Sequence, residues 1–290
     1  MTLLQLYEKI VAFGIDKDPR SDRSKLGGFS DTALLHGDPG LQVRKVMVGI
    51  DIDTAELLLA DKLRSTKGLD LVIAHHPQGK AFAGLSAVMD VQVDLLRSAG
   101  LSASVARGLV EERRQEVDRK IAPANHMRAV DAARLLDIAF MCVHTPADNH
   151  VFRFLEELFA SRTPQTVAQI PDILDELPEY QDARELGAGP RIILGDPRRP
   201  TGRILLEMTG GTSGHADTYK NLRDAGIRTI VAMHMGEEHF KKVRDAQLNV
   251  VIAGHIASDT LGLNLILDRI EKEHKLSVTG VSGFRRHRRI

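Results

Sequence analysis

The chain has no tryptophan, a single cysteine and few aromatic residues of any kind. Aromatics make up 4% of its 290 residues, so aliphatic side chains and methionine must supply the hydrophobic core. Cys142 has no second cysteine to pair with, which excludes an intramolecular disulfide and a metal site built from several thiolates. Because Cys142 lies within an apolar segment, we expect its thiol to be buried and unreactive.

The chain also lacks an excess of charge of either sign. Lysine plus arginine equals aspartate plus glutamate at 39 each, so the formal net charge is zero. Without an overall positive field, a nucleic acid could bind only to a local basic patch. The tail FRRHRRI, residues 284–290, is such a cluster. We expect it to be solvated, with nucleic-acid binding as an alternative.

Long apolar runs are missing as well. No segment approaches the length of a membrane span, and the first helix-like stretch, MTLLQLYEKIVAFGI, contains Glu8 and Lys9 where a secretory signal would be continuously apolar. We therefore expect a cytoplasmic protein. Hydrophobic residues at 43% and charged residues at 27% are typical of a globular chain, and the length suffices for one large domain or two lobes.

The apolar periodicity predicts an α/β fold with two similar halves. Thr2 is placed to cap a helix over residues 2–14. Two β-α-β units follow the same order of elements, namely residues 45–50, 54–67 and 69–74 in one and residues 228–233, 237–246 and 249–253 in the other. Because their lengths and final residues agree, we expect each half to present its strand ends to a shared cleft.

The remaining segments divide the chain. Residues 85–135 are helical in period with an interruption at Pro123, and residues 138–143 predict a strand. The sequence RIILGD-PRRPTG-RILLEM predicts a β-hairpin. We expect an N-terminal α/β segment over 1–160, a proline-rich connection over 161–190 and a C-terminal α/β segment over 191–290.

Three predicted strands run directly into a histidine. They read LDLVIAHHP (69–77), LDIAFMCVHTPAD (136–148) and LNVVIAGHIASD (248–259). Ligands of open α/β sheets bind at the carboxyl ends of the strands. Three such ends carrying imidazoles and carboxylates therefore predict one metal site assembled from distant parts of the chain.

The spacing of these residues favours two metal ions over one. His76 precedes Pro77 and must be extended, so the rings of His75 and His76 point to opposite faces. Two ions about 3.5–4 Å apart could take one ring each. The expected ligands are His75, His76, Asp148, His255 and Asp259. Mixed nitrogen and oxygen ligation suits Zn, Mn, Fe or Co.

Each of these residues also has a simpler interpretation. A single histidine at a strand end is more often a hydrogen-bonded structural residue, and Asp148 and Asp259 could cap helices. We expect His144 to contact the substrate or orient a ligand without binding metal itself. His215, His234 and His239 lie in or near polar loops and are expected to be solvated. It is the convergence of three strand ends that favours the metal site.

A glycine-rich loop, TGGTSGH, follows a predicted strand and precedes a helix. Its backbone amides could hold an anion, with Gly210, Gly211 and Ser213 as candidates, although a plain structural turn would use the same residues. The loop lacks both GxxxxGK[ST] and GxGxxG, which argues against a P-loop ATPase and a dinucleotide-dependent dehydrogenase.

The sequence resembles the Nif3-like family of dinuclear-metal proteins, known as GTP cyclohydrolase I type 2 homologues. The resemblance rests on DLVIAHHP, VHTPAD and AGHIASD in this order, together with LLHGD, GDPRRP and the TGG loop, and covers nearly the whole chain. It implies a two-lobed α/β fold with the metal site in the cleft between the lobes. It also implies a homo-hexameric ring.

By resemblance, His76 and Asp148 would serve one ion, His75 and His255 the other, and Asp259 would bridge them. The family usually has Glu in place of Asp259, and a Trp-Asp-Asn stretch where Gly28, Phe29 and Ser30 precede Asp31. The implied function is metal-dependent hydrolysis of a small, nucleotide-like molecule. The alternative is a non-catalytic metal-binding ring, either a scaffold or a metal chaperone. No residue stands out as a general base.

Overall fold

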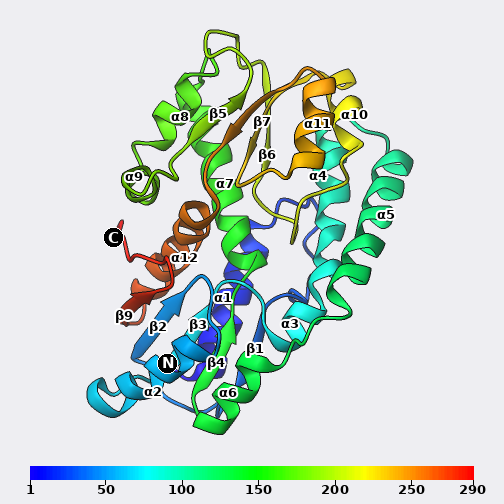
Figure 1. The fold of residues 1–290 in the computed structure, drawn as a ribbon. Coiled ribbons are helices and arrows are strands. Elements are labelled where there is room, and N and C mark those ends of the chain that lie inside the picture. Colours follow the sequence, from blue (N-terminus) through cyan, green and yellow to red (C-terminus); the bar gives the residue numbers. More distant parts are fainter.

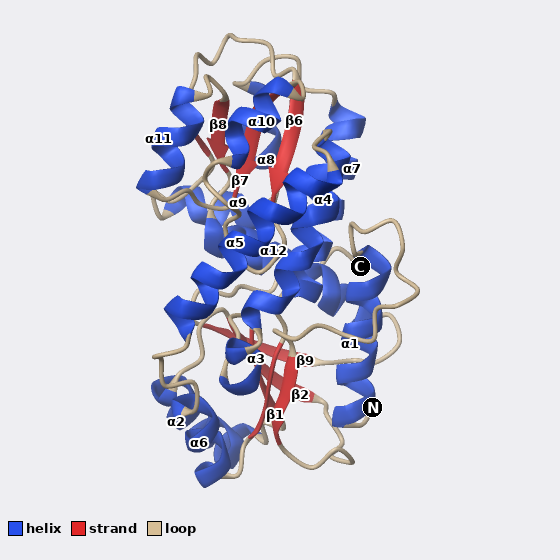
Figure 2. Ribbon diagram, turned by 90° about the vertical axis from the view of Figure 1, so that its right-hand side faces the viewer, coloured by secondary structure: helices blue, strands red, loops and turns tan.

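A computed structural model describes residues 1–290 and divides them between two lobes, each built on a β-sheet flanked by helices (Figure 1; Figure 2). This agrees with the predicted α/β class. The N-terminal sheet has the strand order β1-β4-β3-β2-β9, and the second sheet has the order β5-β8-β7-β6. None of the helices combines the length and the apolar composition that a membrane span needs.

In the first sheet, β2, β3, β4 and β9 are parallel and only β1 runs antiparallel to its neighbour β4. The strands are β1 (Ala33–His36), β2 (Lys45–Gly49), β3 (Leu71–Ala74), β4 (Ala139–Cys142) and β9 (Ser277–Val281). The flanking helices are α1 (Leu3–Lys17), α2 (Thr54–Lys67), α3 (Gly79–Ala83) and α6 (Arg128–Leu136). Thr2 caps α1 through a capping box with Gln5, as its position predicts.

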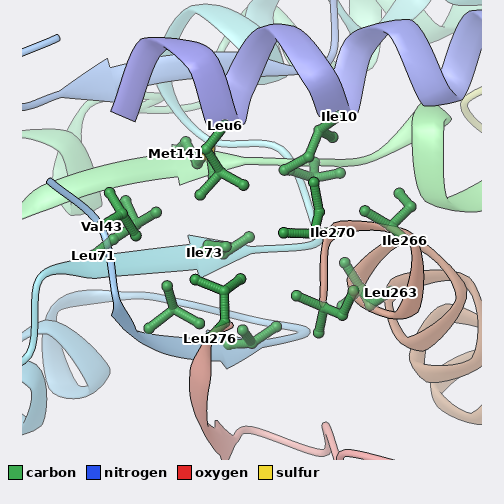
Figure 3. Close-up of a cluster of buried hydrophobic side chains, with 14 of the residues drawn as sticks. Leu6, Ile10, Val43, Leu71, Ile73, Met141, Leu263, Ile266, Ile270 and Leu276 are labelled. Carbon is green, nitrogen blue, oxygen red and sulfur yellow. The ribbon is translucent and has the colours of Figure 1, made fainter. Parts of the chain in front are cut away.

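Alternating side chains of these strands pack against different helices. Leu71, Ile73 and Met141 face α1 and α12 (His255–Glu271). Figure 3 shows Leu6 and Ile10 of α1 above them. Their sequence neighbours on the strands face α2 and α6, and Cys142 is among these, fully buried. Burial raises the pKa of its thiol to about 11, so the expectation of an unreactive cysteine is supported.

The second sheet contains β5 (Arg191–Leu194), β6 (Arg203–Glu207), β7 (Ile227–Ala232) and β8 (Asn249–Ile252). Only β5 is antiparallel. One face packs against α4 (Val91–Ala99), α5 (Ala103–Ile121), α10 (Thr218–Asp224) and α11 (Glu237–Asp245). The other face packs against α7 (Thr145–Arg162), α8 (Gln169–Leu174), α9 (Pro178–Glu185) and α12 (His255–Glu271). The 3₁₀ helix η1 (Leu85–Asp90) precedes α4.

Helices α7 and α12 connect the two lobes and pack against each other. α7 begins after β4 of the first sheet and extends to the second, whereas α12 begins after β8 of the second sheet and leads to β9 of the first (Figure 1). α7 begins at Thr145, and Pro146 suits the first turn of a helix. The first turns of both helices therefore lie between the sheets.

Two expectations about the strands are wrong, one about which strands pair and one about which strands of the two sheets are equivalent. β5 and β6 do not form a hairpin, because β5 pairs with β8 and β6 with β7, at opposite edges of the sheet. The second expectation matched β2 and β3 with β7 and β8. The observed strand orders, β1-β4-β3-β2 and β5-β8-β7-β6, instead place β6 and β7 in the positions that β2 and β3 occupy in the first sheet. The sequence likeness between β2-β3 and β7-β8 reflects burial of both strand pairs, not equivalent positions.

Candidate metal centre

The predicted site residues meet where the carboxyl ends of the strands face each other. His75 and His76 follow β3, and His144 and Asp148 lie at the start of α7 after β4. His255 and Asp259 lie in the first turns of α12 after β8. The structure brings all six side chains into one cluster, in which two groups could each hold a metal ion: His75, His76 and Asp259 in one, and His75, His144 and Asp148 in the other.

Asp259 lies at the centre of three imidazoles. Its Oδ1 is 3.4 Å from Nε2 of His75, and its Oδ2 is 3.4 Å from Nε2 of His76 and 3.5 Å from Nε2 of His255. Asp148 has a parallel arrangement, with Oδ1 3.5 Å from Nε2 of His75 and Oδ2 3.8 Å from Nε2 of His144. Both carboxylates thus face His75. Asp259 also faces His76 and His255, and Asp148 also faces His144.

Three of the histidines are held from outside the cluster through Nδ1. The Nδ1 atoms of His75, His76 and His144 lie 3.0 Å from the Val143 carbonyl oxygen, 2.7 Å from Asp51 Oδ1 and 2.7 Å from Asp31 Oδ2, respectively. If Nδ1–H donates to each acceptor, Nε2 keeps its lone pair and faces inward. This is the tautomer and orientation that metal-binding histidines adopt.

The carboxylates leave oxygen atoms without a hydrogen-bond partner. Oδ1 of Asp148 and both Oδ atoms of Asp259 are buried and accept no hydrogen bond. Buried polar atoms are almost always paired, and an unpaired buried carboxylate is costly. Nitrogen and oxygen atoms that converge at 3.4–3.8 Å are too far apart for a good hydrogen bond. The residues present therefore fit a divalent cation.

The charges of the cluster are strongly coupled. Burial alone would raise the pKa of Asp259, but His75, His76 and His255 outweigh it and hold that pKa well below its usual range. Burial raises the pKa of Asp148 to about 6. Burial lowers the pKa of His255 to about 4, which leaves its imidazole neutral at pH 7.

No protein-family model matches the chain, and no curated protein matches it. Solved structures do. The NIF3 superfamily protein from Sphaerobacter thermophilus superposes on it with a TM-score of 0.78 and 27% sequence identity, over 95% of this chain and 98% of that chain. This chain is a Nif3-like protein.

Two further structures share the fold at lower identity. Reduced HcgD from Methanocaldococcus jannaschii has a TM-score of 0.56 and 13% identity, covering 97% of each chain. TTHA1606 from Thermus thermophilus has a TM-score of 0.53 and 16% identity, covering 97% of this chain and 98% of that chain. These agree with the two-lobed α/β fold that the Nif3-like resemblance implies.

Several residues at the centre of this Nif3-like chain were not expected from the sequence. Asp31 is fully buried and accepts hydrogen bonds from Thr145 Oγ1 at 2.6 Å as well as from His144. Asp51, which follows β2, holds His76. Glu207, which lines a pocket beside the cluster, is the last residue of β6. Because β2 and β6 are both parallel strands, the rule that ligands bind at strand ends could have found Asp51 and Glu207. Asp31 lies on a loop that packs beside β4 and carries no such signal.

The three histidines expected to be solvated differ from one another. His234 lies beside the cluster, with its ring centroid 4.8 Å from that of His255. His239 is buried in α11 and its Nε2 is 2.9 Å from the Gly214 carbonyl oxygen. His215 is partly buried and lies 3.5 Å from Glu112. Solvent exposure was thus the wrong expectation for His239, because α11 packs its ring against Tyr219.

A pocket opens from the cluster toward the second sheet. With its open mouth included, it encloses about 860 Å³ of space that is continuous with solvent. His144, Asp148, His255 and Asp259 line it together with Glu207, Met233 and His234. The glycine-rich loop contributes residues 209 and 211–214. Of the three candidate anion-binding residues, Gly211 and Ser213 line the pocket and Gly210 does not.

The basic tail of this Nif3-like chain is not free in solution. Its side chains pair with carboxylates of α9 and α12: Arg285 and His287 with Asp182, Arg286 with Asp268 and Glu271, Arg288 with Glu271, and Arg289 with Glu179. The expectation of a solvated tail holds in part: Arg285 and Arg288 remain 63% and 53% exposed, but acidic residues of two helices pair with the tail. The same pairing offsets the positive charge that nucleic-acid binding through this segment would need.

Proposed function

We propose that the chain is a dinuclear metal-dependent hydrolase that acts on a small, nucleotide-like molecule, in the manner that its resemblance to GTP cyclohydrolase I type 2 homologues implies. The observation that carries this proposal is the set of buried, unpartnered oxygen atoms of Asp148 and Asp259, which face inward-pointing Nε2 atoms of four histidines. A pocket beside these atoms, lined by residues of the cluster and by hydrophobic side chains, supports it.

The contacts favour one allocation of ligands. Asp148, His75 and His144 would hold one ion, and Asp259 and His76 would hold the other. His255 would join the second set because its Nε2 is 3.5 Å from Asp259 Oδ2, and His75 lies between the two carboxylates. This differs from the allocation that the resemblance implies, in which His76 shares an ion with Asp148. It also makes His144 a ligand, since Asp31 orients it as Asp51 orients His76.

Divalent ions in this position would lower the pKa of a water molecule and stabilise negative charge that develops on the substrate. The chain itself supplies orientation: Asp31 and Asp51 fix two imidazoles, and the Val143 carbonyl fixes a third. His234 lines the same pocket and stays accessible to solvent, and its partial desolvation lowers its pKa, so its neutral ring can accept a proton from a water molecule.

Metal content tests the centre directly. Untagged protein prepared without chelator should contain about two transition-metal ions per chain, and His76→Ala should lose at least one of them. His36→Ala is the matched control, because the His36 ring bonds to Asp137 outside the cluster and its loss should leave the metal content unchanged. No metal in the wild type after reconstitution would contradict the proposal.

Turnover separates the hydrolase from the non-catalytic alternative. Metal-loaded wild type should release formate from GTP, or hydrolyse a phosphoester or amide in a substrate screen, and His234→Ala should slow this reaction with unchanged metal content. Two ions per chain without turnover on any of these substrates would favour a metal-binding scaffold or chaperone.

We also propose a homo-hexamer, as the resemblance implies. Exposed Leu186 and Ile256 line one cavity with His255, which supports coverage of this face by another subunit. Light scattering should give a particle of six times 31.9 kDa. A monomeric mass would contradict the assembly without affecting the metal proposal.

A further inference from the structure

Glu207 is a carboxylate in the pocket that the metal centre does not use. It ends β6 and lies opposite Ala232 of β7, on the edge of the second sheet that faces the metal cluster. It lines the same pocket as Asp259 and His255. The carboxyl ends of β6, β7 and β8 thus present Glu207, His234 and His255 in turn, although the sheet alone would tolerate an apolar residue at the end of β6.

The surroundings of Glu207 leave its charge unmatched. Its one hydrogen bond is donated by the Tyr219 hydroxyl to Oε2 at 3.4 Å, and it forms no ion pair. No lysine or arginine lines the pocket. Burial raises the pKa of Glu207 to about 7. Glu207 is partly buried, and a carboxylate that is largely removed from water without a cation is destabilising, which is tolerated where a ligand supplies the missing partner.

The glycine-rich loop next to Glu207 has its carbonyl groups engaged from behind. Gln92 Nε2 donates to the carbonyl oxygens of Gly210 and Thr212, at 2.8 and 2.7 Å. Arg113 and the His239 ring hold the next two carbonyls. The amides of Gly211, Ser213 and Gly214 have no acceptor within the chain. The loop can therefore donate hydrogen bonds to an acceptor, beside a carboxylate that accepts them.

We propose that Glu207 is a specificity-determining residue that binds a planar substrate group presenting two adjacent N–H donors, such as an amidine or an amino-substituted heterocycle, while the loop amides bind a neutral acceptor on the same molecule. This rests on the proposed function, since it names the substrate class of the same pocket. Six hydrophobic residues suit the faces of a planar ring: Leu95, Leu96, Leu205, Leu206, Met208 and Met233.

This proposal changes the role expected for the loop. Gly211 and Ser213 were candidates for binding an anion, but an anion in this part of the pocket would meet Glu207 without any lysine or arginine to offset the repulsion. Two N–H donors match the two oxygens of a carboxylate, as in bidentate pairs between guanidinium and carboxylate groups. The pocket therefore favours nitrogen donors near Glu207 and leaves anionic groups to the metal end.

Three ligands of nearly equal shape test the assignment by calorimetric titration at pH 8: benzamidine, benzamide and benzoate. Wild type should bind benzamidine more tightly than benzamide, and Glu207→Gln should weaken benzamidine about 10-fold or more, the loss expected for hydrogen bonds to a charged group. Glu237→Gln is the control, because Glu237 is an exposed carboxylate of α11 outside the pocket.

The titrations are run on chelator-treated and metal-loaded protein, with metal content measured in parallel. Benzamidine binding that survives chelation in wild type and is weakened in Glu207→Gln supports Glu207 even if the metal proposal fails, because Asp148 and Asp259 line the same pocket in both proteins. Equal benzamidine affinity in wild type and Glu207→Gln overturns the assignment of Glu207. If the same protein contains two bound ions, the proposal of a metal centre is unaffected. If Glu207→Gln does not fold, the wild-type series decides, since chelated protein that prefers benzoate or benzamide over benzamidine also overturns it.

Discussion

Two aspartates outside the cluster orient histidines of the proposed metal centre, and they differ in how accessible their carboxylates are. Asp31 is fully buried beneath His144 and also accepts a hydrogen bond from Thr145, so replacing it would disturb the fold and the site together. Asp51 contacts His76 at 2.7 Å, yet its side chain is 67% exposed. Asp51 can therefore be changed with little effect on the core, which makes it the better probe of orientation.

We expect Asp51→Asn to lower metal affinity about 10-fold, in the range found for groups that orient metal-bound histidines. The amide can still accept a hydrogen bond from Nδ1, but it no longer increases the basicity of the ring. Competition with a fluorescent chelator measures the affinity. Asp61→Asn on α2 is the control, since Asp61 pairs only with Arg64. Equal affinities in the two variants would show that Asp51 does not act through His76.

Glu207 predicts a pH dependence of stability that does not involve the metal. Burial raises its pKa from 4.5 to about 7, so the folded state binds this proton more tightly than the unfolded chain. Its contribution is fully present below pH 4.5 and is lost as pH rises through about 7. In chelator, Glu207→Gln should gain about 1–3 kcal/mol of unfolding free energy relative to wild type between about pH 5 and pH 8.5. A difference that stays constant with pH in urea titrations would contradict this.

The sequence could predict which histidines and aspartates form the cluster, but not the groups that orient them. His75, His76 and His255 follow apolar strands, and strand ends converge by the geometry of parallel sheets. Asp31 reaches His144 only because β1 pairs antiparallel with β4 and brings the preceding loop alongside. That pairing joins segments far apart in the chain, and no local pattern specifies it.

Among the elements, α7 and α12 determine how far apart the two carboxylates lie. Gly262 of α12 sits against α7, where an added Cβ would lie 2.5 Å from the Ala147 carbonyl oxygen. Ala147 precedes Asp148, and Gly262 is three residues after Asp259. A side chain at position 262 would therefore push apart the helix turns that carry both aspartates.

Gly262→Ala should destabilise the protein by about 1–3 kcal/mol, as overpacking of a close contact does, and should also weaken metal binding. Gly108→Ala in α5 is the matched control: nothing lies within 4 Å of its added Cβ. There, relief of glycine's entropy cost should stabilise by about 0.5–1 kcal/mol. Urea unfolding and metal titration measure both variants. A stabilised Gly262→Ala with intact metal affinity would show that the helices can separate freely.

The elements themselves were largely predictable, whereas their partners were not. Apolar periodicity located α2 over Thr54–Lys67 and the strands β3, β4 and β8 within two residues of their ends. The predicted hairpin failed because β5 and β6 pair with the buried strands β8 and β7 and not with each other. Turn residues between two strands specify a change of direction, but burial of the central strands decides which edges they occupy.

At the scale of the whole molecule, the C-terminal tail closes the chain onto α9 and α12. Arg289 forms a bidentate pair with Glu179, whose side chain is fully buried and also accepts a hydrogen bond from Asn264. Arg288 also pairs with a carboxylate, but its side chain is 53% exposed. The two neighbouring arginines therefore differ in how far their ion pairs are shielded from water.

Arg289→Ala should lower the unfolding free energy by about 1–3 kcal/mol, because it leaves Glu179 buried without a cation. Arg288→Ala, with an exposed ion pair, should cost less than about 1 kcal/mol. Denaturant titration of both variants checks the order.

Neither variant should alter retention on a nucleic-acid column in low salt, since wild type is expected not to bind. Salt-sensitive retention that both substitutions reduce would restore the nucleic-acid alternative.

The proposed metal centre joins the two halves of the molecule, so metal binding should stabilise both sheets together. Its residues follow β3 and β4 of the first sheet and β8 of the second. An ion at about 100 times its dissociation constant should add about 2.7 kcal/mol to the unfolding free energy, and His76→Ala should lose most of this gain. Amide hydrogen exchange locates the effect, because ions held by both halves must slow exchange in β3 and β8 alike. Protection confined to β3 would mean that His255 and Asp259 do not hold metal, and that the two halves are joined by the packing of α7 against α12 alone.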